Sequence, residues 1–266
     1  MKKKKRITGK KGEMTTAELV GLIILILSFV VLLLFWLMAN LGGETNAQIC
    51  HNSVMLQTGV GKALSQPLNC KTDYVCISGG QSCNDFTASN TIKIANTDVA
   101  QMKQEAMRAI ADQMANCWWE FGEGAVNYAG YLVATHAQNN IAICSIISFD
   151  SKIQQNIPEI SYTDLYNYMQ DTKYDQSQTY LQYLYGISSV SQFVPQDKII
   201  VNVQSDKITT GQKYSVITGV SHDTGIISPK EVIFNVYLIP TAETNSRIIT
   251  PSCQVSSCPN QFITKA

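Results

Sequence analysis

The sequence contains none of the common short motifs that carry catalytic chemistry. It has no G-x-S-x-G, H-E-x-x-H, P-loop or G-x-G-x-x-G pattern, and its three histidines, His51, His136 and His222, lie far apart. The absence of any C-x-x-C pair argues against a thioredoxin-like redox enzyme. We therefore expect no enzymatic activity, no cofactor and no metal. An anchored hydrolase that uses Glu123 or His136 is kept as an alternative.

Charge is scarce and unevenly distributed. Only 15% of the residues are charged, and the formal net charge is zero. The first segment, MKKKKRITGKKG, carries seven Lys or Arg residues and no acid, whereas the chain beyond residue 18 has 13 basic and 18 acidic residues, a net charge of −5. An acidic main portion argues against nucleic acid as a partner. No N-x-S/T sequon is present, so no N-glycan is expected.

One long apolar run extends from Leu19 to Ala39, 21 residues without a charge. A helix of that length rises about 30 Å, the thickness of a bilayer's hydrocarbon core. Basic residues beside a span are retained in the cytoplasm, and the run is too long for a secretory leader. We therefore predict a basic cytoplasmic head (residues 1–18), one retained transmembrane helix (residues 19–39) and an extracytoplasmic remainder in the cell membrane.

The segment before this run has two interpretations. Residues 15–18, TTAE, match a capping box in which Thr15 and Glu18 begin the helix. Alternatively, residues 10–14, KKGEM, resemble the class III signal peptides of archaeal type IV pilin-like proteins. That resemblance implies cleavage between Gly12 and Glu13 and assembly through the hydrophobic helix. Glu18 would then be the sixth residue of the mature chain, whereas a glutamate at the fifth is common in such proteins.

All eight cysteines follow the apolar run. They are Cys50, Cys70, Cys76, Cys83, Cys117, Cys144, Cys253 and Cys258. An even number on the predicted extracytoplasmic side indicates up to four disulfides. Zinc is the alternative, but the spacings do not match paired zinc knuckles and no histidine lies near either cysteine group. The spacing leaves the connectivity open; it is compatible with a local Cys253–Cys258 loop and a helix-to-strand Cys117–Cys144 link.

Residues 44–150 form a cysteine-rich α+β region in this interpretation. A short helix is compatible with residues 44–64, and a short strand is expected at residues 74–77. The clearest helix begins after a cap at Asn96 or Thr97 and carries an apolar stripe from Val99 to Cys117. Residues 141–149, IAICSIISF, predict a buried strand.

Residues 151–266 combine tyrosine-rich helices with a β-rich end. One helix is expected to start near Ser161, and a second to run from a cap at Ser177 to Leu184. Strands are expected at residues 198–204, 213–219 and 231–239. The predicted fold class is α+β, with the main amphipathic helix packed on an antiparallel sheet.

The most distinctive short stretch is CWWEFGEG, residues 117–124. Its glycines permit a turn around Glu123, and its aromatic rings would cover a disulfide of Cys117. Alternatively, Trp118, Trp119 and Glu123 border a carbohydrate or peptide site. Glu120 and Glu123 are also spaced for acid–base work, although no feature of the sequence indicates a raised pKa.

Seven of the twelve tyrosines lie between residues 162 and 185. Tyrosine offers a large rigid ring with a polar tip, which binding surfaces use. One hypothesis is that these rings pack two short helices on the sheet. The other is a partner surface that includes Tyr162, Tyr166, Tyr180 and Tyr183.

Four segments together resemble an uncharacterised family of archaeal single-span membrane proteins. They are PLNCKT (67–72), VCI (75–77), CWWEFGEG (117–124) and ICS (143–145). The resemblance covers roughly residues 45–150, and it implies a topology and an origin but no mechanism.

We therefore expect a membrane-anchored cell-surface protein with a structural, adhesion or assembly role, including that of a pilin-like subunit. Its partners would be the membrane, through Leu19–Ala39, and either further copies of itself or another surface protein. The alternative is a surface receptor for a protein, peptide or carbohydrate.

Overall fold

The computed structural model describes residues 16–40, 45–59, 68–128, 138–192, 207–223, 230–244 and 260–262. The chain divides into two units, Met1–Glu44 and Thr45–Ala266. The predicted processing site at Gly12 and Glu13, the histidine His136, and the cysteines Cys253 and Cys258 lie outside the described residues.

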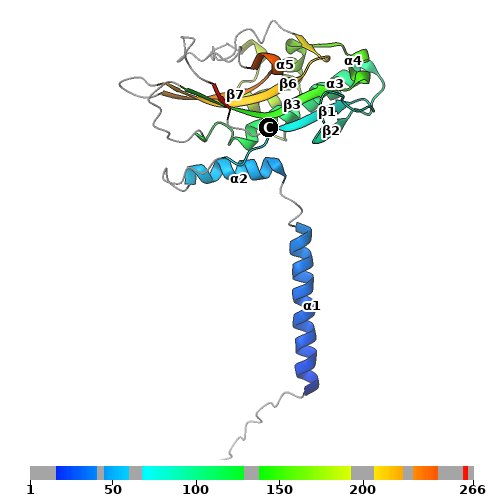
Figure 1. Cartoon of the computed structure of the whole chain (residues 1–266), viewed down its shortest axis with the longest axis vertical. Coiled ribbons are helices and arrows are strands. Elements are labelled where there is room, and N and C mark those ends of the chain that lie inside the picture. Colours follow the sequence, from blue (N-terminus) through cyan, green and yellow to red (C-terminus); the bar gives the residue numbers. More distant parts are fainter. Residues whose placement is uncertain are drawn as a thin grey trace, which may run out of the picture. The chain divides into compact units, whose positions relative to one another are not determined.

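The first unit contains helix α1 (Thr16–Asn40), which includes the apolar run (Figure 1). Its side chains are described for residues 19–33, and the large apolar ones among them are between 41% and 68% exposed. Within the described residues, no helix is both long and apolar enough to cross a membrane. The transmembrane assignment of residues 19–39 is therefore not confirmed and stays a prediction.

The second unit is built on a sheet with the strand order β2-β1-β3-β6-β7, and β8 also pairs with β3. The strands are β1 (Asp73–Ser78), β2 (Asn90–Lys93), β3 (Gln138–Phe149), β6 (Tyr214–Asp223), β7 (Lys230–Pro240) and β8 (Asn260–Phe262). The strands expected at residues 74–77, 141–149, 213–219 and 231–239 are confirmed, and the one at 198–204 lies outside the described residues.

The sheet is mixed, so the prediction of an antiparallel sheet was wrong. Strand β1 is parallel to β2 and β3, and β8 is parallel to β3, whereas the pairs β3–β6 and β6–β7 are antiparallel. The physical reason is the connection between β1 and β3, which includes helix α3 (Val99–Glu120). A crossover of that length returns the chain in the same direction, whereas a tight hairpin would reverse it.

Helix α3 packs on strands β3, β6 and β7, as the apolar stripe predicted. Its buried positions include Met102, Ala106, Ile110, Met114 and Cys117, spaced three or four residues apart. The predicted cap was wrong: the N-cap is Asp98, whose side chain accepts a hydrogen bond from the backbone N–H of Gln101 at 3.0 Å.

Smaller elements surround this core. They are α2 (Asn46–Gly59), α4 (Ser151–Asn156), α5 (Tyr162–Asp171), α6 (Tyr180–Tyr185), the 3-10 turns η1 (Val190–Gln192) and η3 (Thr241–Glu243), and the antiparallel pair β4 (Glu159–Ser161) with β5 (Lys207–Thr209). Ser161 caps α5, as predicted. Helix α6 is capped by Thr179 rather than by Ser177, because Thr179 and Gln182 form a reciprocal capping box.

Three disulfides connect the described cysteines: Cys50–Cys70, Cys76–Cys83 and Cys117–Cys144. The helix-to-strand link between Cys117 and Cys144 is thus confirmed. The register between β3 and β6 shifts between Ile143 and Ser145, so Cys144 lies at a β-bulge.

Candidate functional site

The C-terminal end of α3 forms a tight turn with three consecutive residues in the left-handed region. Their φ angles are +76° at Gly122, +56° at Glu123 and +73° at Gly124. The backbone N–H of Glu123 donates to the carbonyl oxygen of Trp118 at 2.9 Å, which closes the turn. The predicted turn around Glu123 is confirmed. Glu123 itself adopts a conformation that is uncommon for a residue with a side chain.

The aromatic residues of this segment have separate roles. Trp118 and Phe121 are buried, and Trp118 lies so close to Gly124 that a Cβ atom there would be 2.7 Å from its ring. Trp119 is half-buried and stacks in parallel with His51 of α2, with ring centroids 4.2 Å apart. His51 Nδ1 lies 2.6 Å from the carbonyl oxygen of Trp119, and because that oxygen only accepts, Nδ1 carries the proton. No pattern in the sequence indicates this contact between α2 and α3.

Glu123 is exposed and contacts α6 (Tyr180–Tyr185), 60 positions away in the sequence. Its Oε1 accepts a hydrogen bond from the hydroxyl of Tyr183 at 2.7 Å. The ring of Tyr183 stacks in parallel on Tyr174, with centroids 4.2 Å apart. Burial, followed by the hydrogen bond to Glu123, holds the pKa of Tyr183 well above its usual value, so this hydroxyl stays a donor. We call Glu123, Tyr174 and Tyr183 the Glu123 site.

A second tyrosine–carboxylate contact lies beside the Glu123 site. The buried Tyr180 donates its hydroxyl hydrogen to Asp112 of α3, and Tyr174 meets the ring of Tyr180 edge-on at 5.4 Å. Asp112 also faces Arg108, whose Nε is 4.0 Å from Oδ2. The carboxylate of Asp112 therefore has a cation close by.

The other predicted surface tyrosines belong to the interior. Tyr162, Tyr166 and Tyr180 are buried, and so is Trp118. Tyr162 donates to the carbonyl oxygen of Leu238 at 2.9 Å, and Tyr185 to that of Val236 at 2.7 Å, so these hydroxyls hold α5 and α6 on β7. Burial raises the pKa of Tyr166 to about 12. Most of the predicted binding surface is therefore core packing, and Tyr183, Trp119 and Glu123 are its accessible part.

Glu120 and Glu123, considered together in the sequence, lie in different environments. Glu120 is 7% exposed, and burial, followed by the charge of Asp73, raises its pKa from 4.5 to about 8. Such a carboxyl group holds a proton near neutral pH, whereas the carboxylate of Glu123 lies at the surface. The carboxyl groups of Glu120 and Glu123 thus differ in burial and do not share one environment.

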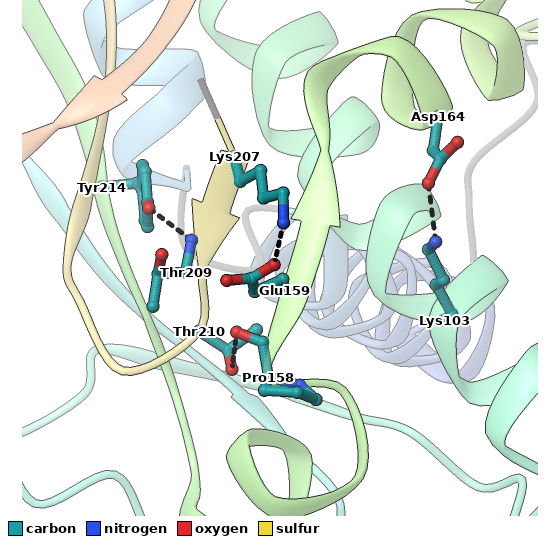
Figure 2. A network of polar contacts seen from close by, with 8 residues as sticks. All are labelled: Lys103, Pro158, Glu159, Asp164, Lys207, Thr209, Thr210 and Tyr214. Carbon is teal, nitrogen blue, oxygen red and sulfur yellow. Dashed lines mark hydrogen bonds and ion pairs between the residues drawn. The ribbon is translucent and has the colours of Figure 1, made fainter. Parts of the chain in front are cut away.

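The polar contacts in Figure 2 are structural. Lys103 of α3 pairs with Asp164 of α5 at 2.7 Å, and Lys207 of β5 with Glu159 of β4 at 2.5 Å. The hydroxyl of Thr210 donates to the carbonyl oxygen of Pro158 at 3.2 Å, and the hydroxyl oxygen of Tyr214 accepts from the backbone N–H of Thr209 at 2.7 Å. Lys103 thus connects α3 with α5, and the Thr209–Tyr214 contact connects β5 with β6. None of the described His, Cys, Asp and Glu residues form a group that could hold a metal ion.

The molecule is thus an α+β protein with a mixed sheet and disulfides, and Glu123 lies at its surface with Tyr183 and Tyr174. Comparison with known proteins finds no family model, no curated protein and no solved structure that matches the chain. The two resemblances stated from the sequence stay predictions.

Proposed function

We propose that the protein is a membrane-anchored, extracytoplasmic cell-surface protein with a structural or assembly role. The observation that carries the proposal is the set of three disulfides in the unit that follows α1. Disulfides form and persist in oxidising compartments and are rare in the cytosol. A chain whose second unit is cross-linked in this way is best suited to the outer side of a membrane.

The proposed anchor is the uncharged run from Leu19 to Ala39. As a helix, this run of 21 residues would rise about 31 Å, close to the roughly 30 Å of a hydrocarbon core. The exposure of its apolar side chains supports the proposal, since apolar groups in contact with water are unfavourable. The basic head then favours a cytoplasmic N-terminus.

Membrane extraction tests the anchor directly. Leu25 and Leu32 are among the most exposed apolar residues of α1. Replacing both with Arg should release the protein during an alkaline wash of native membranes, because each central arginine costs about 2.5 to 3.5 kcal/mol on insertion. The matched control, Leu25→Ala with Leu32→Ala, should stay with the membrane. Release of the unmodified protein by the same wash would contradict the anchor.

The pilin-like form of the proposal rests on the resemblance of residues 10–14 to a class III signal peptide. It is tested by the intact mass of protein recovered from its own membranes. A mature chain that begins at Glu13, and that keeps its head when Gly12 is replaced by Val, would support a processed, assembling subunit. A chain that still begins at Met1 would leave a plain anchor.

A receptor role is the second candidate. It is favoured by the accessible Glu123 site, where a carboxylate and two stacked tyrosine rings lie together at the surface. Structural contacts alone do not require an exposed carboxylate at a left-handed position.

A further inference from the structure

We propose that Glu123, Tyr174 and Tyr183 recognise a guanidinium or ammonium group on a basic side chain of a partner protein. The proposal does not depend on the membrane anchor, since all three residues belong to the second unit. It rests on charge, on the arrangement of the rings and on the fixed position of the carboxylate.

The charge argument comes from two similar contacts with different surroundings. Asp112 accepts a hydroxyl hydrogen from Tyr180 and also faces Arg108. Glu123 accepts one from Tyr183, and the ion pairs between two described residues, Lys103–Asp164, Arg108–Asp112 and Lys207–Glu159, do not include it. Among the described side chains, therefore, Glu123 has no cationic partner. A bound cation would give Glu123 the neighbouring positive charge that Arg108 gives Asp112.

The rings add an attraction for the same kind of group. Tyr174 and Tyr183 lie parallel, 12° apart, and Tyr174 is 37% exposed. The face of a tyrosine ring attracts a cation within about 6 Å of its centre. A guanidinium is planar and can lie over a ring while its N–H groups donate to a neighbouring carboxylate. A carboxylate next to stacked tyrosines therefore suits arginine better than it suits a neutral ligand.

The carboxylate is also held in place before any ligand arrives. The left-handed backbone at Glu123, between Gly122 and Gly124, directs the side chain, and the hydrogen bond from Tyr183 fixes Oε1. Non-glycine residues in this conformation are found preferentially at functional sites. A fixed acceptor loses little freedom on binding, which favours affinity.

The test uses the full chain in a neutral detergent and a short acetylated peptide, Gly-Arg-Gly amide, with NMR of labelled tyrosine rings as the readout. The peptide should shift the resonances of Tyr174 and Tyr183 in a saturable way. Replacing its arginine by the isosteric, uncharged citrulline should weaken binding about three- to tenfold, the range expected for exposed ion pairs and cation–π contacts. Glu123→Gln should weaken it by a similar factor, and Tyr174→Leu should weaken it as well.

The matched control is Glu159→Gln, which removes one exposed carboxylate far along the chain and should leave binding unchanged. Equal loss in this control would mean that net charge attracts the peptide, and would overturn the proposal. Unchanged affinity in Glu123→Gln, or equal binding of the citrulline peptide, would also overturn it. If a neutral oligosaccharide shifts the tyrosine resonances and the arginine peptide does not, the site is a carbohydrate site and the proposal is wrong.

Discussion

The two halves of the sheet are stabilised in different ways. The parallel half, β2, β1 and the C-terminal part of β3, has short strands, and β2 is largely exposed. The antiparallel half, β3, β6 and β7, has long strands with a well-buried interior. The described disulfides all attach to α2, β1, α3 or β3, and none attaches to β6 or β7. The described cross-links thus involve α2, β1, α3 and β3, and each one constrains the unfolded chain.

The loop after β1 shows how a disulfide and hydrogen bonds stabilise the parallel half. The disulfide Cys76–Cys83 closes it, and the buried carboxylate of Asp150 accepts hydrogen bonds from the Ser78 hydroxyl at 3.0 Å and the Gln81 N–H at 2.8 Å. Burial alone would raise the pKa of Asp150, but these hydrogen bonds and that from the N–H of Ile153 outweigh it and lower the pKa. One ionised side chain thus holds a loop that has little apolar surface of its own.

The largest expected effect is the loss of Cys117–Cys144, the disulfide that links helix α3 to strand β3. Replacing both cysteines by alanine should lower the free energy of unfolding by about 3.5 kcal/mol, because the disulfide joins residues 27 positions apart. The same change at Cys76–Cys83, with a separation of only 7, should cost about 2.5 kcal/mol. Urea unfolding measures both. Equal losses would show that loop length does not govern these links.

The next effect concerns the antiparallel half, where Gly219 lies opposite Phe234. A Cβ atom at position 219 would come within 2.1 Å of the Phe234 ring and 2.6 Å of the Asn140 backbone oxygen. Gly219→Ala should therefore destabilise the protein by about 3 kcal/mol through overpacking. Gly211→Ala is the control, since nothing lies within 4 Å of the added atom. If Gly219→Ala had nearly the stability of the parent, the antiparallel half would be able to shift around the added methyl group.

How far the sequence predicts this structure differs between the two halves. The strands β6 and β7 and helix α3 follow from patterns of apolar residues, which report burial directly. The parallel pairing of β1 with β3 does not, because strand direction depends on a crossover rather than on any local pattern. The choice of Asp98 over Thr97 as cap is likewise set by where the helix packs, since both side chains can cap.

The candidate site was only partly predictable. The turn at Glu123 follows from its flanking glycines, but its contact with Tyr183 joins segments 60 positions apart and leaves no trace in the sequence. The sequence shows that tyrosines are concentrated between residues 162 and 185. Which of them are buried and which are accessible depends on the helix face that packs against β7. Tyr162 and Tyr166, four residues apart, lie on the buried side of α5.

A third prediction tests the tyrosine hydroxyls that hold the antiparallel half. Tyr162→Phe with Tyr185→Phe keeps both rings but removes the donors to the carbonyl oxygens of Leu238 and Val236. Each lost hydrogen bond should cost about 1 kcal/mol, since a buried acceptor loses its partner. Tyr183→Phe, whose acceptor Glu123 is exposed, should cost less. Thermal unfolding measures the loss of stability in both variants. A larger loss in Tyr183→Phe than in the double variant would contradict this expectation.

A fourth prediction concerns the pH dependence of stability that follows from Glu120, which is buried at the end of α3 near Asp73 of β1. Because the folded protein keeps a proton on Glu120 up to about pH 8, while the unfolded chain releases it near pH 4.5, stability should fall as the pH rises between these values. Glu120→Gln replaces the titratable carboxyl group by a neutral amide. The variant should therefore be about 1 to 2 kcal/mol more stable than the parent at about pH 8. Urea midpoints measured across this range check the slope. A parent and a variant with the same slope would show that Glu120 is ionised in the folded state.

The smallest expected effect lies outside both halves, in the β4–β5 pair. Lys207 and Glu159 form an ion pair of 2.5 Å (Figure 2), but their side chains are 63% and 48% exposed. Water and salt screen such pairs, so a double-mutant cycle with Lys207→Met and Glu159→Gln should give a coupling below about 0.5 kcal/mol. Thr210, a short distance along the same segment, is buried and donates to Ile157, so Thr210→Val should cost more than removal of the ion pair. A stronger coupling in the ion pair than the loss at Thr210 would mean that surface charge, and not buried polar contacts, fixes this segment beside the antiparallel half.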